Sequence, residues 1–182
     1  IARRGRHDDV VIATKVGSDM GLGHRCLKAE YIVQAAEASL RRLQVDALDL
    51  YQSHWDDETT PFQETLEAYA TLLKAGKVKA VGASNLTAPR LAEALEVSRH
   101  HALPQYATLQ PHYNLYERGS YEGALEALCV RENLGSARAR RLAPARANRP
   151  SVLRGASAGN GSPPPLAFVG RPVAHATIAR VR

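Results

Sequence analysis

Short apolar runs alternate along the chain with longer segments whose apolar residues recur at helical spacing. The four runs are residues 10–13, 47–51, 78–81 and 106–109, each short enough for a strand buried on both faces. The amphipathic segments are residues 31–43, 61–75, 89–100 and 123–133. This alternation predicts parallel strands joined by right-handed crossovers, and therefore an α/β fold.

The second amphipathic segment carries the clearest local signals. Thr60 and Gln63 have the spacing of a capping box, Pro61 suits the first helical position, and Gly76 suits the end of the helix. The acidic run 56–58 lies just before this helix and is predicted to stabilise its N-terminal dipole.

Two α/β architectures are compatible with the pattern, an open doubly wound sheet and a (β/α) barrel. The segment 17–23 is rich in glycine and follows a predicted strand. It lacks both the G-x-G-x-x-G spacing and a Walker lysine, so we interpret it as a flexible connection rather than a nucleotide loop.

Polar side chains stand where each predicted strand ends: Lys15, His54, Ser84 with Asn85, and Gln110. Alone, Lys15 reads as a solvated charge, His54 as a structural histidine, and Ser84-Asn85 as a turn. Together they occupy the same end of four successive strands. In a barrel those ends converge on one pocket, and in an open sheet they line a crevice.

Composition narrows the class of protein. The 182 residues are 45% apolar and 23% charged, which suffices for a core, and no apolar run approaches the ~18 residues of a membrane span. Cys26 and Cys129 are read as free thiols of a reducing compartment, and His24 with Cys26 makes too small a set for a metal site. We expect a cytoplasmic protein without a metal or a membrane partner.

The net charge of +6 is unevenly distributed. Residues 1–135 carry 15 Lys and Arg against 18 Asp and Glu, whereas residues 136–182 carry nine arginines and no acid. This tail is dominated by Ala, Arg, Pro and Gly, so we expect it to be disordered. We interpret residues 1–135 as the folded domain and the tail as a product of out-of-frame reading. A nucleic-acid-binding arm is the alternative. Proteins that bind single strands stack bases on aromatic side chains, and Phe168 is the one aromatic residue of the tail.

Four stretches around the strand-end residues follow one another as VVIATKVG, LDLYQSHW, GKVKAVGASN and LQPHYNL. In this order and separation they resemble the third to sixth barrel strands of the aldo-keto reductase superfamily. The nearest resemblance is to its bacterial and potassium-channel β-subunit-like branch. It covers about residues 1–135 and implies part of a (β/α)8 TIM barrel.

The resemblance implies a carbonyl reductase that uses NADPH, less often NADH, on a small aldehyde or ketone. Lys15 and His54 match the catalytic lysine and histidine of the family. The lysine lowers the pKa of the tyrosine that donates a proton, and the histidine polarises the carbonyl. Ser84, Asn85 and Gln110 match the residues that orient the nicotinamide carboxamide.

The resemblance also sets expectations about what the chain lacks. The family's catalytic Asp and Tyr belong to units that would precede Ile1, and its seventh and eighth strands would follow Gly135. We therefore expect an incomplete, poorly active fragment. A non-catalytic, cofactor-binding regulatory subunit is the alternative function.

Overall fold

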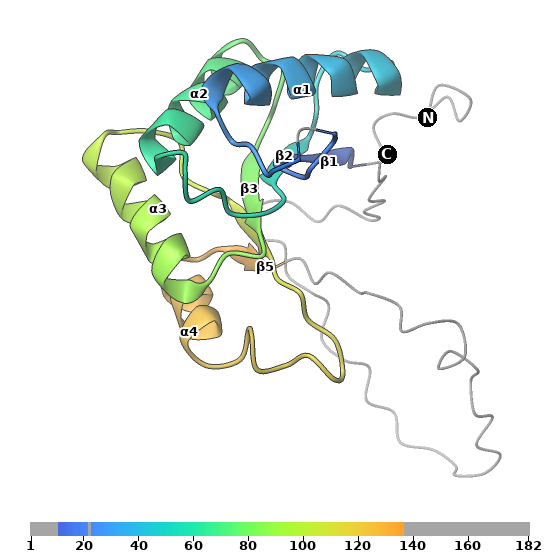
Figure 1. Cartoon of the computed structure of the whole chain (residues 1–182). Helices are drawn as coiled ribbons and strands as arrows, with labels where there is room; N and C mark the ends of the chain where they lie inside the picture. Colours follow the sequence, from blue (N-terminus) through green and yellow to red (C-terminus); the bar gives the residue numbers. More distant parts are fainter. Residues whose placement is uncertain (1–10, 22, 137–182) are drawn as a thin grey trace, which may run out of the picture.

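The computed structural model of the chain describes residues 11–21 and 23–136 (Figure 1). Within them strands and helices alternate in the order β1 (Ala13–Val16), α1 (Ala29–Leu43), β2 (Leu50–Ser53), α2 (Phe62–Lys74), β3 (Val81–Ser84), α3 (Ala88–His100), β4 (Thr108–Gln110), α4 (Ala124–Arg131) and β5 (Gly135–Ser136). Apart from Ser136, which lies in β5, the predicted disordered tail falls outside the described residues. No helix of the described part is long and apolar enough to cross a membrane.

The strands form one parallel sheet in the order β1-β2-β3-β4-β5. The helices lie along one side of this sheet (Figure 1). A doubly wound sheet would instead carry helices on both faces, with a reversal in strand order. The sequential order with helices on one side is the arrangement of a partial (β/α) barrel, so the predicted fold class is confirmed.

The register assigns alternate residues to opposite faces of the sheet, because residues paired across parallel strands point the same way. Val16, Ser53, Ala83 and Leu109 form one row across β1 to β4, and Val16, Ala83 and Leu109 belong to the core. The neighbouring row, which lies on the other face, is Lys15, Gln52, Gly82, Thr108 and Gly135. We call this second face, which lies opposite the helices, the inner face. Along this row every residue is either polar or a glycine.

The main core lies between the sheet and the helices. Each of the first three helices contributes fully buried side chains to it: Ile32 and Ala36 from α1, Leu66 and Tyr69 from α2, and Leu91 and Leu95 from α3. Burying a large apolar side chain contributes about 1.5–3 kcal/mol. These are positions that the helical periodicity predicts to face inward, so the amphipathic pattern is confirmed.

Each of β1 to β4 begins and ends later along the chain than the apolar runs predict. The runs mark residues that are buried on both faces, but strand pairing continues beyond them into polar residues such as Gln52 and Ser84. Ahead of the strands proper, Leu48 and Val78 form an isolated bridge. The sequence thus located the strands but placed their carboxyl ends too early.

The predicted capping box is wrong. Helix α2 begins at Phe62 with Pro61 as its N-cap and no side-chain cap. The Thr60 hydroxyl instead donates to Asp57 Oδ2 at 2.7 Å. A carboxylate is a strong hydrogen-bond acceptor, which favours this contact. The predicted end of the helix is correct, since Gly76 follows it at φ +70°.

Gly82 is required by the packing of the inner face. A Cβ at this position would lie 2.3 Å from Thr108 Oγ1 and 3.1 Å from the Thr108 carbonyl oxygen. Overpacking of this kind costs about 1–3 kcal/mol. We predict that Gly82→Ala lowers the free energy of unfolding by that amount in urea titrations.

Gly119→Ala is the matched control, because a Cβ at Gly119 would have no neighbour within 4 Å. Its free energy of unfolding should stay within about 1 kcal/mol of the parent chain. Equal effects of the two substitutions would contradict the assigned register between β3 and β4.

Candidate functional site

The carboxyl ends of the strands bring together four of the five predicted site residues through direct hydrogen bonds. Ser84 Oγ donates to the Gln110 carbonyl oxygen at 2.8 Å. Asn85 Nδ2 donates to the His54 carbonyl oxygen at 2.9 Å and to Ser84 Oγ at 3.1 Å. The ends of β2, β3 and β4 are therefore tied to one another by the side chains of Ser84 and Asn85.

Asn85 occupies a backbone conformation that favours its residue type. Its φ of 56° lies in the left-handed region, which asparagine tolerates better than most residues. Its N–H donates to the Gln110 carbonyl oxygen at 3.3 Å. The turn after β3 is thus fixed by backbone and side chain together.

Lys15, the fifth predicted residue, lies in β1 beside Gln52 of β2 and is partly buried. The His54 N–H donates to the Val16 carbonyl oxygen at 2.7 Å, which continues the β1–β2 pairing by one step. Lys15 and His54 therefore belong to adjacent strands at the same end of the sheet, as the sequence predicts.

The His54 ring contacts groups from two loops. Its Nδ1 is hydrogen-bonded to the Ser18 hydroxyl of the β1–α1 loop. The ring centroid lies 5.4 Å from that of Trp55, and the Arg25 guanidinium lies 4.6 Å from the Trp55 centroid. A cation over an indole ring is attracted by the ring's quadrupole, so Arg25 also fastens the two loops together.

Asp57 makes a further connection between these loops. Its Oδ2 accepts the Leu27 N–H at 2.8 Å, and its Oδ1 accepts the N–H and hydroxyl of Thr59. Burial alone raises the pKa of this carboxyl, but the hydrogen bonds from Thr59, Thr60 and the Leu27 backbone outweigh burial, so its pKa is lowered. The sequence predicts only a helix-dipole role for this residue.

Asp56 fixes the same loop to α3. Both of its oxygens accept from Arg90, at 2.6 Å from Nε and 3.0 Å from Nη2. The Arg90 guanidinium also lies 4.2 Å from the centroid of the Phe62 ring. The pairing is partly buried and bidentate, a geometry that gives orientation as well as energy.

Several buried polar atoms of the described residues have no hydrogen-bond partner. They are Gln52 Nε2, Thr108 Oγ1, Gln110 Oε1 and His112 Nε2. An unpaired buried polar group costs about 1–3 kcal/mol. Gln52 and Thr108 flank Gly82 in the row that contains Lys15, and Gln110 ends β4, so these atoms cluster on or next to the strands that carry the candidate site.

The buried tyrosines serve the core rather than the site. Tyr51 donates to the Ile32 carbonyl oxygen of α1, and Ser53 Oγ shares hydrogen bonds with the hydroxyls of Tyr69 and Tyr106. Burial raises the pKa of Tyr106 to about 12 and that of Tyr69 well above its usual value. These phenols hold their protons too tightly to act as acids near neutral pH.

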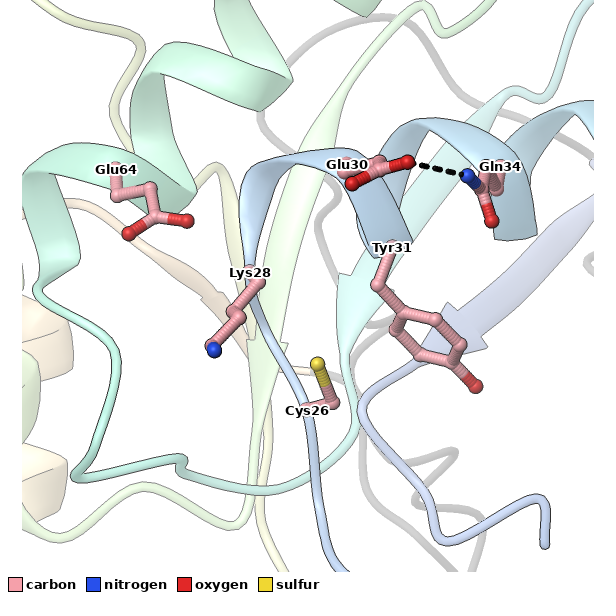
Figure 2. Close-up of a pocket in the computed structure, with 6 residues that line it drawn as sticks. All are labelled: Cys26, Lys28, Glu30, Tyr31, Gln34 and Glu64. Atoms are coloured by element: carbon pink, nitrogen blue, oxygen red, sulfur yellow. Dashed lines mark hydrogen bonds between the residues drawn. The ribbon is translucent and has the colours of Figure 1, made fainter. Parts of the chain in front are cut away.

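A cavity of about 370 Å³ lies where the chain enters α1 (Figure 2). It is lined by Cys26, Lys28, Glu30, Tyr31, Gln34 and Glu64. Glu64 already accepts the Ala29 N–H at 2.9 Å, and Glu30 accepts from Gln34 at 3.0 Å. Both carboxylates of this lining therefore make hydrogen bonds at the start of α1. Within the described residues no group of three or more His, Cys, Asp or Glu side chains could hold a metal ion.

The sequence predicts no role at the site for Ser18 or Gln52, and for Asp57 it predicts only a helix-dipole role. Gln52 stands two residues before His54, so strand alternation could have placed it on the same face. Nothing in the local sequence indicates that Ser18 meets His54, because the contact joins loops 36 residues apart.

Comparison with known proteins matches residues 1–145 to the aldo/keto reductase family. Aldo-keto reductase YhdN of Bacillus subtilis (strain 168) is 39% identical over 127 residues, which make up 69% of this chain and 37% of that protein. L-glyceraldehyde 3-phosphate reductase of Escherichia coli (strain K12) is 34% identical over 113 residues, 61% of this chain and 32% of that protein.

A probable voltage-gated potassium channel subunit beta of Oryza sativa subsp. japonica is 32% identical over 131 residues, 71% of this chain and 40% of that protein. In each of these three comparisons the matched part of the chain spans two fifths or less of the relative.

Asp57 gives a prediction about stability and pH. Because its pKa is lower in the folded chain than in the unfolded chain, its carboxylate stabilises the fold above the ordinary aspartate pKa of about 3.9. That contribution is lost as the pH falls through the folded pKa. We predict that Asp57→Asn flattens the acid side of a plot of unfolding free energy against pH.

The matched control is Asp46→Asn, since Asp46 is exposed in the loop that follows α1. Urea unfolding should be followed from neutral pH down to about pH 3. Profiles of equal steepness for the Asp57 variant and the parent chain would contradict the role assigned to this carboxylate.

Proposed function

The chain belongs to the aldo/keto reductase family, and we propose that it contributes the lysine, the histidine and part of the nicotinamide site of an NADP(H)-dependent oxidoreductase. The proposed reaction reduces an aldehyde or ketone to an alcohol. The activity and substrate of the whole protein belong to this proposal, because the chain spans only part of the length of its relatives.

The observation that carries the proposal is the unpaired Oε1 of Gln110. This acceptor is buried at the end of β4, and the Ser84 hydroxyl donates to the carbonyl of the same residue. A nicotinamide carboxamide carries two N–H donors, so its amide group would satisfy Oε1. The fit is chemical: an amide acceptor without a donor stands in the group of residues that the family resemblance assigns to a carboxamide.

Asn85 and Ser84 would act on orientation rather than on charge. The Nδ2 of Asn85 is hydrogen-bonded to His54 and Ser84, so the Asn85 side-chain amide cannot rotate without breaking these two hydrogen bonds. A rigid cradle of this kind lowers the entropy lost on binding and selects one face of the bound ring.

Lys15 and His54 would act on the proton side of the reaction. The bound cofactor supplies a hydride to the carbonyl carbon. The Lys15 ammonium would lower the pKa of a phenol that donates a proton to the carbonyl oxygen, and His54 would donate a hydrogen bond to the same oxygen. Both effects stabilise negative charge as it develops on that oxygen.

A second candidate function is that of a regulatory subunit that binds the cofactor without turnover. It is favoured by the similarity to the potassium channel subunit beta of Oryza sativa. Both functions require the same cofactor site, and they differ only in whether bound cofactor is oxidised by an added carbonyl compound.

We predict that Gln110→Met weakens NADPH binding by roughly 2- to 10-fold, the effect of one ordinary hydrogen bond, while the free energy of unfolding stays equal or rises. One hydrogen bond from the carboxamide is lost, and an unpaired buried acceptor is removed at nearly constant volume. Binding can be followed by the fluorescence of Trp55, the single tryptophan, which lies beside His54.

Gln63→Met is the matched control, because it makes the same chemical change on the exposed face of α2. Its NADPH affinity should equal that of the parent chain. Absence of saturable NADPH binding by the parent chain would overturn the proposed function, and unchanged affinity in Gln110→Met would remove Gln110 from the site.

A further inference from the structure

We propose that Ser18 is a positioning residue that holds His54 in the neutral tautomer with its proton on Nε2. The proposal rests on the proposed function, in which His54 donates a hydrogen bond to the carbonyl oxygen of the substrate and therefore needs its proton on Nε2. The tautomer of the His54 ring can be measured without cofactor or substrate.

The contact joins the Ser18 hydroxyl to His54 Nδ1. A neutral imidazole has one nitrogen that donates and one that accepts, and the partner of one nitrogen decides the state of the other. When the serine hydroxyl donates to Nδ1, the ring proton resides on Nε2. Ser18 would therefore turn His54 into a donor at the nitrogen opposite the contact.

The backbone around Ser18 leaves the hydroxyl little freedom to move away. Gly17 has a φ of +91°, and a Cβ there would lie 2.8 Å from Leu27 Cδ2 and 3.5 Å from the Trp55 carbonyl oxygen. On the other side, Asp19 Oδ1 accepts the N–H groups of Gly21 and Gly23, both at 3.0 Å. Ser18 thus lies between a closely packed glycine and a turn that is held by hydrogen bonds.

The histidine is fixed just as firmly. Its N–H donates to Val16, its carbonyl oxygen accepts from Asn85, and its ring lies against Trp55. Leu27, which packs against Gly17, is itself held by Asp57. The main chains of both residues are thus held in place. The contact then depends on the rotation of the Ser18 hydroxyl and on the tautomer of the His54 ring.

The decisive measurement is the pair of ¹⁵N chemical shifts of the His54 ring in the full chain, recorded above the ordinary histidine pKa of about 6.5. The parent chain should show Nε2 as the protonated nitrogen and Nδ1 as the acceptor. Ser18→Ala should lower the ratio of the Nε2–H to the Nδ1–H form by roughly 2- to 10-fold, the equilibrium effect of one ordinary hydrogen bond. Ser18→Thr keeps a hydroxyl and should restore the ratio.

Ser120→Ala is the matched control, because that hydroxyl donates to the carbonyl oxygen of another histidine, His112, rather than to a ring nitrogen. The His54 shifts should not change in this variant. If Ser18→Ala does not fold, Ser18→Cys, a nearly isosteric and weaker donor, should give an intermediate ratio.

A parent chain with the proton on Nδ1, or an unchanged ratio in Ser18→Ala or its Cys substitute, would overturn the proposal. NADPH affinity separates this outcome from failure of the proposed function. Ser18→Ala should bind NADPH as the parent chain does, whereas a parent chain that shows the Nε2 tautomer but no NADPH binding refutes the oxidoreductase function and leaves the tautomer assignment intact.

Discussion

The parallel register from β1 to β5 is the constraint on which the rest of the structure depends. It pairs Lys15 with Gln52, Gln52 with Gly82 and Gly82 with Thr108, so one row of the inner face is settled once the strands pair. The same pairing turns Tyr51 and Ser53 toward the helices, where they bond to α1 and α2. A slip of one residue would exchange these sets and would place the lysine in the apolar core.

The register alone does not hold the site, because its residues stand at or beyond the last paired positions. The two loops that flank His54 are joined at the Ser18, Trp55 and Asp57 side chains, and Asp56 fixes the second loop to α3. Each of these contacts alone contributes little to the stability of the loops. Together they connect three βα units, so the position of the imidazole depends on the packing of α1, α2 and α3 rather than on a single loop.

The sequence predicted the βα alternation and the polar strand ends because both follow from local periodicity. It missed the roles of Asp57 and Ser18 because each acts across loops distant in sequence, Asp57 on the Leu27 N–H and Ser18 on the His54 ring. It also misassigned Thr60 as a cap, because this hydroxyl can serve either the helix or Asp57 three residues earlier, and the local sequence does not decide between them. Short-range patterns report which residues are buried, whereas hydrogen-bond partners depend on which loops meet.

The polar residues of the inner face lower the stability of the fold. An apolar face would leave no unpaired atoms, yet Gln52, Thr108 and Gln110 each bury one, and Gly82 contributes no side chain to packing. Such a surface is costly for a fold that uses it only for packing, and it becomes favourable when a polar ligand or water completes the missing bonds. The unpaired atoms of Gln52, Thr108 and Gln110 lie on β2 and β4, next to the strand ends that carry His54, Ser84 and Asn85, and the cofactor binding proposed above would complete part of their hydrogen bonding.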